Sequence, residues 1–172
     1  MINNPYLPIV GFGDTNTDYL GGLSKLWLVP REWLSGFPEL DPTSQKLSAE
    51  PTLIAGKNWI GPIDVSDEMK AYEEVTASSA AGVYFKRKVS FGENGQAAAN
   101  HLNIGNYIGY ELCVVALVRS GAYFIVIGND KAGLKLDINA GTGVGPLGMP
   151  STKLVLSDES AFRALILANF SH

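Results

Sequence analysis

Few residues of this chain are able to do nucleophilic or metal chemistry. The only cysteine is Cys113, and the two histidines are His101 and His172. Reactive thiols need a polar, partly exposed setting, but Cys113 lies in the apolar run 112–118, where a thiol packs as a small core side chain. A structural zinc ion needs several Cys or His ligands. We therefore predict neither a catalytic pair of Cys113 with His101 nor a zinc site.

Carboxylates stand next to one another at residues 67–68, 73–74 and 158–159. Successive side chains of a strand point to opposite faces, so Glu73 and Glu74 would not converge on one substrate. The other two pairs fit the first turn of a helix. The alternative is a hydrolase that uses Glu73 or Asp137 in a cleft, which requires two carboxyl groups about 5 to 10 Å apart.

The polar run near the N-terminus resembles the first half of a calcium loop. Asp14, Asn16 and Asp18 supply alternate oxygen ligands. Tyr19 then stands where such a loop requires glycine, and Lys25 stands where it requires a bidentate glutamate. These residues predict a hydrated polar arm.

A glycine-rich stretch has the spacing of a dinucleotide-binding loop, through Gly143, Gly145 and Gly148. Such a loop binds phosphate with free amides at the start of a helix. Here Pro146 has no amide, and the next segment, 153–156, is strand-like. A flexible connector is the preferred interpretation. We predict no catalytic residue, no cofactor and no metal ligand.

The charge of the chain argues against binding through DNA phosphates. Its 172 residues include 17 acids and 13 Lys or Arg, for a net charge of −4 and a pI near 5.1. Residues 1–82 carry eleven acids and five bases, whereas residues 83–172 carry six acids and eight bases. The one tight basic cluster, Lys86 to Lys88, is expected on a solvated strand face or paired with Glu73 and Glu74.

No segment is suited to crossing a membrane. The longest apolar runs, 112–118 and 122–127, are far shorter than the roughly 20 residues that a bilayer requires. The N-terminal MINNPYLPIV lacks the basic start and long apolar stretch of a secretory signal. We expect an unsecreted protein, cytoplasmic unless it is part of a virion.

The elements that must position these residues are mostly strands. Residues 1–20 have no sustained period and predict an extended N-terminal arm, followed by a single domain over 21–172. Residues 83–91 alternate most clearly, with Arg87 as the one charge on the apolar face. A hairpin of 111–118 with 122–127 is also expected. Further strands are expected at 23–29, 59–65, 72–76, 134–138 and 153–156.

Helical signals are fewer. Residues 96–103, with three alanines and no β-branched residue, predict a helix that ends before Gly105. Residues 30–33 predict a short helical turn that begins at a proline. The C-terminal segment 157–170 has apolar residues at helical spacing. A closing strand over 161–167 is the alternative, and we prefer the helix.

Together these segments predict a mainly β domain of the α+β class. Its expected form is a two-sheet β-sandwich or a partly open barrel with one inserted helix and an extended N-terminal arm. Residues 37–51, rich in Pro, Ser, Thr and Asp, predict a long surface loop. Trp27, Trp33 and Trp59 are expected to fill the core or to pack between subunits.

The order of elements from Tyr72 to about Ser160 resembles tail-tube-like proteins of long-tailed phages and prophages. The segment 21–29, a Gly-Gly pair followed by a strand, also resembles the beginning of that family. The matching segments are Tyr72 and Glu73, the strand 83–91, a helix ending near Leu102 and Asn103, the strand 111–118, the return 121–128, Ala132 and Gly133, the strand 134–138, Thr142 and Gly143, and the strand 153–156.

This resemblance implies a sandwich or barrel flanked by a helix, whose copies form hexameric rings that stack into a tube for the genome. It implies a non-enzymatic virion structural protein, with itself and other tail proteins as partners and DNA as a transient, non-specific cargo. Residues 3–20 and 37–51 are the expected contact surfaces. A head-to-tail ring needs two different complementary surfaces. A small-ligand-binding barrel with an enclosed apolar pocket is the alternative.

Overall fold

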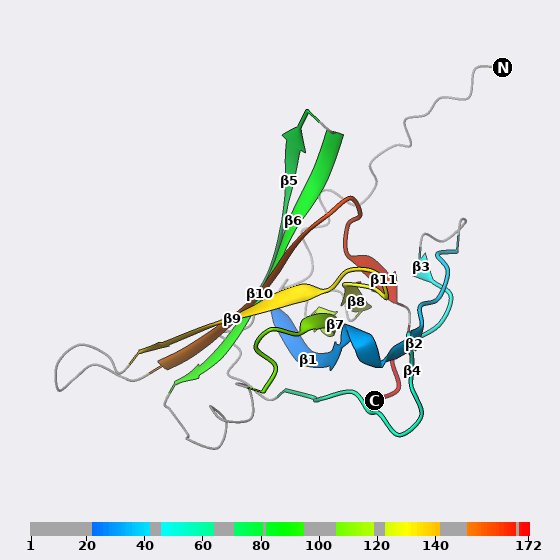
Figure 1. The fold of residues 1–172 in the computed structure, drawn as a ribbon, viewed down its shortest axis with the longest axis horizontal. Helices are drawn as coiled ribbons and strands as arrows, with labels where there is room; N and C mark the ends of the chain where they lie inside the picture. The colour runs from blue at the N-terminus through cyan, green and yellow to red at the C-terminus, as the bar shows by residue number, and fades with distance from the viewer. Residues whose placement is uncertain are drawn as a thin grey trace, which may run out of the picture.

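The computed structural model describes residues 22–41, 46–63, 71–80, 82–94, 106–118, 123–141, 151–167 and 169–172. These residues are mainly β, in a large sheet of nine strands and a small sheet of two (Figure 1). They contain no α-helix, and hence none able to span a bilayer. The predicted arm over 1–20 and the predicted helix over 96–103 lie outside them.

The large sheet has the strand order β3-β11-β8-β7-β9-β10-β6-β5, and β1 pairs with the other edge of β7. All of its pairs are antiparallel except β11 with β3. Its strands are β1 (Leu23–Pro30), β3 (Lys46–Leu47), β5 (Ala71–Ser79), β6 (Gly82–Asn94), β7 (Glu111–Val118), β8 (Tyr123–Ile127), β9 (Leu134–Gly141), β10 (Ser151–Ser160) and β11 (Leu165–Leu167). The small sheet pairs β2 (Leu34–Gly36) with β4 (Thr52–Leu53), and η1 (Arg31–Trp33) is a 3-10 turn.

Strand β7 organises the core because both of its faces are buried. Leu112, Val114 and Ala116 lie in one apolar cluster, whereas Cys113 and Val115 lie in a second. All five side chains are fully buried. A continuous apolar run is the sequence that a strand covered on both faces requires.

The first cluster joins the two halves of the large sheet. It contains Leu26, Val114 and Ile127 from β1, β7 and β8, and also Val89, Leu136 and Leu156 from β6, β9 and β10. Both sets of strands belong to one hydrogen-bonded sheet. The sheet therefore folds back on itself around a shared apolar interior.

Aromatic residues close the second cluster. Trp27 and Trp59 each contact Phe170 edge to face, with ring centroids 5.0 and 5.3 Å apart. Both tryptophans are buried, so the predicted core-filling role is confirmed for them. Trp33 packs at the margin of this cluster, where the Lys57 ammonium lies 4.4 Å from the ring centroid.

The predicted strands at 23–29, 72–76, 83–91, 134–138 and 153–156 are confirmed, as are the hairpin of β7 with β8 and the helical turn at η1. The preferred C-terminal helix is wrong. Residues 157–160 continue β10, and part of the alternative closing strand is present as β11. Asp158 lies opposite Arg87, and Glu159 lies opposite Lys86. Because opposite charges across neighbouring strands stabilise a sheet, these acids extend β10 instead of starting a helix.

Two other segments differ from the prediction. The described part of 59–65 forms no regular strand. It nevertheless follows the edge of β1 opposite to β7, where the Leu28 N–H donates to Ile60 O over 3.0 Å. Pro62 has no N–H and so interrupts such a ladder. The predicted loop 37–51 contains the short strand β3, which pairs with β11.

The corner between β8 and β9 gives a test of the packing around β7. Gly128 has a φ of +88°, and a Cβ there would lie 3.1 Å from the carbonyl oxygen of Leu112 and 3.3 Å from the Cα of Cys113. Overpacking of this kind costs about 1 to 3 kcal/mol. We expect Gly128→Ala to lower the free energy of unfolding, measured in urea, by that amount beyond a matched control.

The control is Gly109→Ala, because Gly109 has a φ of +91° and no atom within 4 Å of the added Cβ. Both variants carry the backbone strain of a positive φ, so their difference isolates the contact with β7. Equal losses of stability in the two variants would contradict a tightly packed corner.

Candidate functional site: a polar sheet face with two open edges

Four consecutive strands of the large sheet, β9, β10, β6 and β5, form a wing that extends beyond the rest of the fold (Figure 1). One face of the wing is apolar, since Val89, Phe91, Leu154 and Leu156 are buried in the first cluster. Because side chains alternate along a strand, the residues between them lie on the opposite, polar face. We call this surface the polar face.

The polar face is hollowed into a groove of about 770 Å³. Its lining includes Glu73 and Val75 of β5, Lys86 and Lys88 of β6, Lys135 of β9, and Ser157 and Glu159 of β10. A ligand-binding barrel would need an enclosed, mostly apolar pocket. This groove is open and lined mostly by charged residues, and in the described part of the chain apolar side chains fill the interior of the fold.

Ion pairs on the polar face are exposed. Lys86 Nζ lies 3.4 Å from a Glu159 carboxylate oxygen, and Lys88 Nζ lies 4.0 Å from one of Glu73. The prediction that Lys86 and Lys88 lie on a solvated face is confirmed, as is the pairing of this cluster with Glu73. Among the described acids, none lies within ion-pair distance of Lys135.

Arg87 lies on the apolar face, as its place in the alternation predicted. Its side chain is only 5% exposed and forms a two-pronged ion pair with Asp158, in which Nε donates to Oδ1 over 2.8 Å and Nη2 donates to Oδ2. Nη1 donates to the carbonyl oxygens of Phe162 and Arg163 at 3.3 and 3.5 Å. A buried guanidinium needs all of these partners because desolvation of a charge is costly.

Glu74 connects β5 to the segment between β10 and β11. Its Oε2 accepts hydrogen bonds from the Tyr72 hydroxyl at 2.7 Å and the Ala164 N–H at 2.8 Å, and its Oε1 accepts one from Arg163 Nε at 2.7 Å. Burial acts to raise the pKa of Glu74, but these hydrogen bonds outweigh it and lower that pKa. Burial first, and the bond to Glu74 second, raise the pKa of Tyr72.

The wing has two open edges. Within the described part of the chain, β5 pairs with β6 alone, so its outer edge is free over all nine residues. On the opposite side, the pairing of β9 with β7 covers only Leu134 and Lys135, so residues 136–141 present a second edge that is free of any other described strand. Unpaired N–H and C=O groups of this kind are a template for strand addition.

The tip of the wing is exposed on both faces. β10 ends at Ser160 opposite Phe85, so the last residues of the β5–β6 hairpin have no third strand beside them. Val83 is 61% exposed there, and the successive residues Ser78 and Ser79 are both exposed. A two-stranded ribbon is marginally stable in water, so this tip is suited to contact with another molecule.

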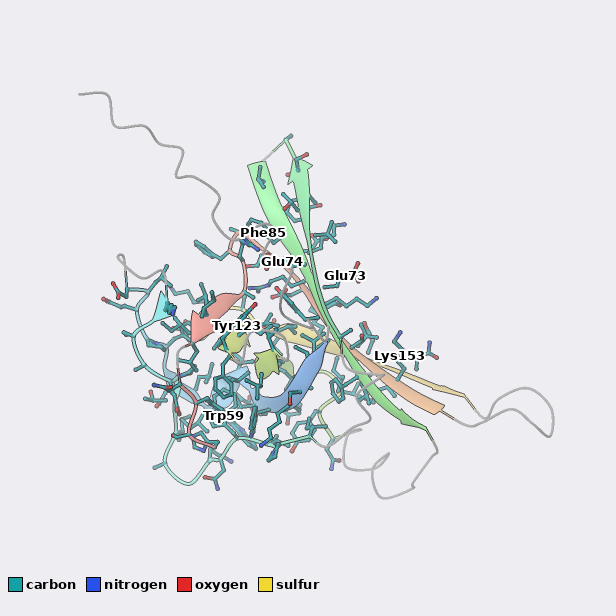
Figure 2. All side chains as sticks on the ribbon, turned by 180° about the vertical axis from the view of Figure 1, so that it is seen from behind. Trp59, Glu73, Glu74, Phe85, Tyr123 and Lys153 are labelled. Atoms are coloured by element: carbon teal, nitrogen blue, oxygen red, sulfur yellow. The ribbon has the colours of Figure 1, made fainter. Side chains whose placement is uncertain are left out.

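Glu73 and Glu74 do not converge. Glu73 is exposed on the polar face, whereas Glu74 accepts hydrogen bonds on the other side, as predicted from their adjacency (Figure 2). Glu73 and Asp137 lie on strands three positions apart, a backbone separation of about 14 Å at the usual strand spacing. The two carboxylates are therefore not on neighbouring strands.

Cys113 lies in the second cluster with no exposed surface, and burial raises the pKa of its thiol to about 12. It is therefore a core residue, as predicted. His101, the calcium-like run at 14–18 and the glycine spacing at 143–148 lie outside the described residues. Within the described ranges no three metal-ligating side chains come together.

Sequence reasoning missed Asp158 as the partner of Arg87 and missed both open edges. A charge on the apolar face of strand 83–91 is a signal that a buried counter-charge exists, but it does not indicate which acid supplies it. Free edges depend on strand order, and strand order is a property of long-range pairing that alternation within one strand does not reveal.

The buried ion pair gives a second test. Asp158→Leu leaves the Arg87 charge buried without its counter-ion, so we expect the free energy of unfolding to fall by about 3 to 5 kcal/mol. The double variant Arg87→Leu with Asp158→Leu removes both charges and should recover most of that loss. Urea denaturation measures both variants, and equal losses would argue against the unpaired charge as the cause.

The lowered pKa of Glu74 gives a pH test. A carboxylate whose folded pKa lies below its ordinary value of 4.5 stabilises the fold above that pH and loses this effect as the pH falls through the folded pKa. We expect the stability difference between the wild type and Glu74→Gln to be constant near neutral pH and to shrink below pH 4.5. Denaturation curves across this range measure it.

Glu73→Gln is the matched control, because the Glu73 side chain is 64% exposed and its ion pair with Lys88 spans 4.0 Å. An exposed pair of this kind contributes little to stability. The same loss of stability difference at low pH in both variants would contradict the specific role of Glu74.

Comparisons with known proteins add no relative. No protein-family model, no curated protein and no solved structure matches the chain. The wing is the most distinctive surface of the described residues, since it combines a polar grooved face, two open edges and a tip exposed on both faces.

Proposed function

We propose that this chain is a non-enzymatic structural subunit that assembles with copies of itself, of the tail-tube type found in long-tailed phages and prophages. The observation that carries the proposal is the pair of open edges, on β5 and on β9, at opposite sides of one four-stranded wing. Two different edges on one subunit are what a head-to-tail assembly needs.

The directions of the strands allow the β5 edge of one copy to pair with the β9 edge of the next. Neighbours in the wing are antiparallel throughout, so β5 and β9 run in opposite directions. When β5 of one copy lies beside β9 of the next, the antiparallel alternation continues without interruption. Each copy adds four strands, which is an even number, so the alternation also holds where the last copy meets the first. A ring of any number of copies, including a hexamer, therefore closes with antiparallel pairs.

The two faces of the wing set the orientation of such a ring. The apolar face is covered by the rest of the subunit, so only the polar face is free to line a common channel. The polar face carries charges of both signs, namely Lys86, Lys88, Lys135 and Lys153 with Glu73, Asp137 and Glu159. A solvated wall of mixed charge suits transient, non-specific passage of DNA. In this proposal the protein acts in a virion tail beside other tail proteins.

The finer architecture belongs to the same proposal. The fold-back of the large sheet around the first cluster supports a two-sheet sandwich or a partly open barrel. An inserted helix at 96–103 and an arm at 1–20 complete that picture, and residues 3–20 serve as a contact with a neighbouring copy. In the loop 37–51, β3 is already paired with β11, so its contacts with neighbours come from exposed side chains such as Leu40.

Proline substitutions on β5 test the assembly. Successive N–H groups of a strand point to opposite edges, so one of Thr76→Pro and Ala77→Pro removes an N–H bonded to β6, and the other removes an N–H at the open edge. Proline is tolerated in edge strands only where its missing N–H faces outward. We expect the outward variant to keep the stability of the monomer and to lose self-association.

Sedimentation velocity and negative-stain imaging measure association, and urea denaturation of each variant identifies which proline faces outward. The inward variant is the built-in control, since it lowers stability through the lost bond to β6. A wild-type chain that stays an 18.4 kDa monomer at high concentration, or an outward variant that still assembles, would contradict the proposal.

A further inference from the structure

The floor of the groove on the polar face contains one cross-strand row of hydrogen-bond donors. Lys88 lies directly opposite Ser157, and Ser157 lies directly opposite Lys135. All three residues line the groove. Directly opposite residues have Cβ atoms roughly 5 Å apart, so a hydroxyl stands midway between two lysine stems on three adjacent strands.

The acids around this row leave some N–H donors of its two lysines without a partner among the described residues. Lys88 shares its charge with Glu73 across 4.0 Å, and both side chains are exposed. Glu111 lies opposite Lys135 in the register, but its carboxylate is 3.0 Å from Arg31. Lys135 therefore has no ion pair among the described residues.

The side chain of Ser157 likewise makes no hydrogen bond to a described residue. Other acids of the polar face lie outside the row. Glu159 is 3.4 Å from Lys86, and Asp137 lies two residues beyond Lys135 on β9. Exposed ion pairs of this kind contribute little to stability, so an incoming anion is able to compete with Glu73 for Lys88.

We propose that Lys88, Ser157 and Lys135 bind a phosphate oxyanion. Each ammonium offers several N–H donors and the hydroxyl offers one, whereas phosphate oxygens accept several hydrogen bonds. Hydrogen bonds between ionised partners are stronger than neutral ones. Free phosphate and the backbone of a nucleic acid share this chemistry. The site lies within one copy of the chain and does not depend on assembly.

Equilibrium dialysis of the full chain against radiolabelled inorganic phosphate tests the site at constant ionic strength, in any oligomeric state. We expect saturable binding to the wild type. Loss of a charged hydrogen-bond partner costs about 1.5 to 3 kcal/mol, so Lys88→Gln and Lys135→Gln should each weaken binding about tenfold or more. Ser157→Ala should weaken it by a smaller factor.

Lys153→Gln is the matched control, because Lys153 is exposed on the same face but does not line the groove (Figure 2). It should leave phosphate binding unchanged. A second arm uses a fluorescent, single-stranded oligothymidylate and the same variants. Binding of both probes assigns the site to phosphate in general, and binding of the oligonucleotide alone assigns it to a nucleic-acid backbone.

The absence of saturable binding of either probe would overturn the site. So would an equal effect of Lys135→Gln and Lys153→Gln, because the binding would then reflect the net charge of the face and not the row. These outcomes are independent of the association measurements, so the site and the proposed assembly fail or succeed separately.

Discussion

The burial of β7 on both faces is the constraint on which the other elements depend. Leu112, Val114 and Ala116 face one cluster, and Cys113 and Val115 face the other, so a single strand holds two layers of packing together. Burial of each Leu or Val side chain contributes about 1.5 to 3 kcal/mol. One layer is closed by the fold-back of the sheet and the other by the aromatic cluster around Phe170. Every strand that pairs with β7 is therefore placed by this requirement.

The wing extends away from the body because β9 pairs with β7 over only two residues. The chain turns at Gly128 and Gly133, close to the backbone of β7, and β9 leaves after two paired residues. Its remaining strands pack on the body through one face, and among the described residues the opposite face and both edges are uncovered. Two sets of polar contacts tie this wing to the segment before β11: the bonds of Arg87 Nη1 to the carbonyl oxygens of Phe162 and Arg163, and the bonds of Glu74 to Arg163 and Ala164. Buried charges require such partners, so these contacts restrict the angle of the wing.

The edges and the polar face of the wing differ in chemistry. The edges carry the proposed assembly, and the polar face carries the proposed phosphate site. The edges offer backbone groups that recognise another strand without regard to its side chains. The polar face offers lysines and a hydroxyl in a groove. If copies pair through their edges, the row of Lys88, Ser157 and Lys135 recurs once per copy along the lined channel. Acids on the same face, Glu73 and Glu159 among them, limit its net charge, which is compatible with a polyanion that moves past without tight binding.

The sequence alone determined the class of the fold and the position of most strands. Alternation over 83–91 and the apolar run 112–118 report burial directly, because a strand covered on one face or on both imposes that pattern. It also placed Arg87 on the apolar face and Cys113 in the core. Tertiary structure alone decided that Asp158 and Glu159 extend β10, since the opposing Lys86 and Arg87 come from a distant part of the chain. The open edges and the groove were likewise decided by strand order, which arises from pairing between remote segments and has no local signature.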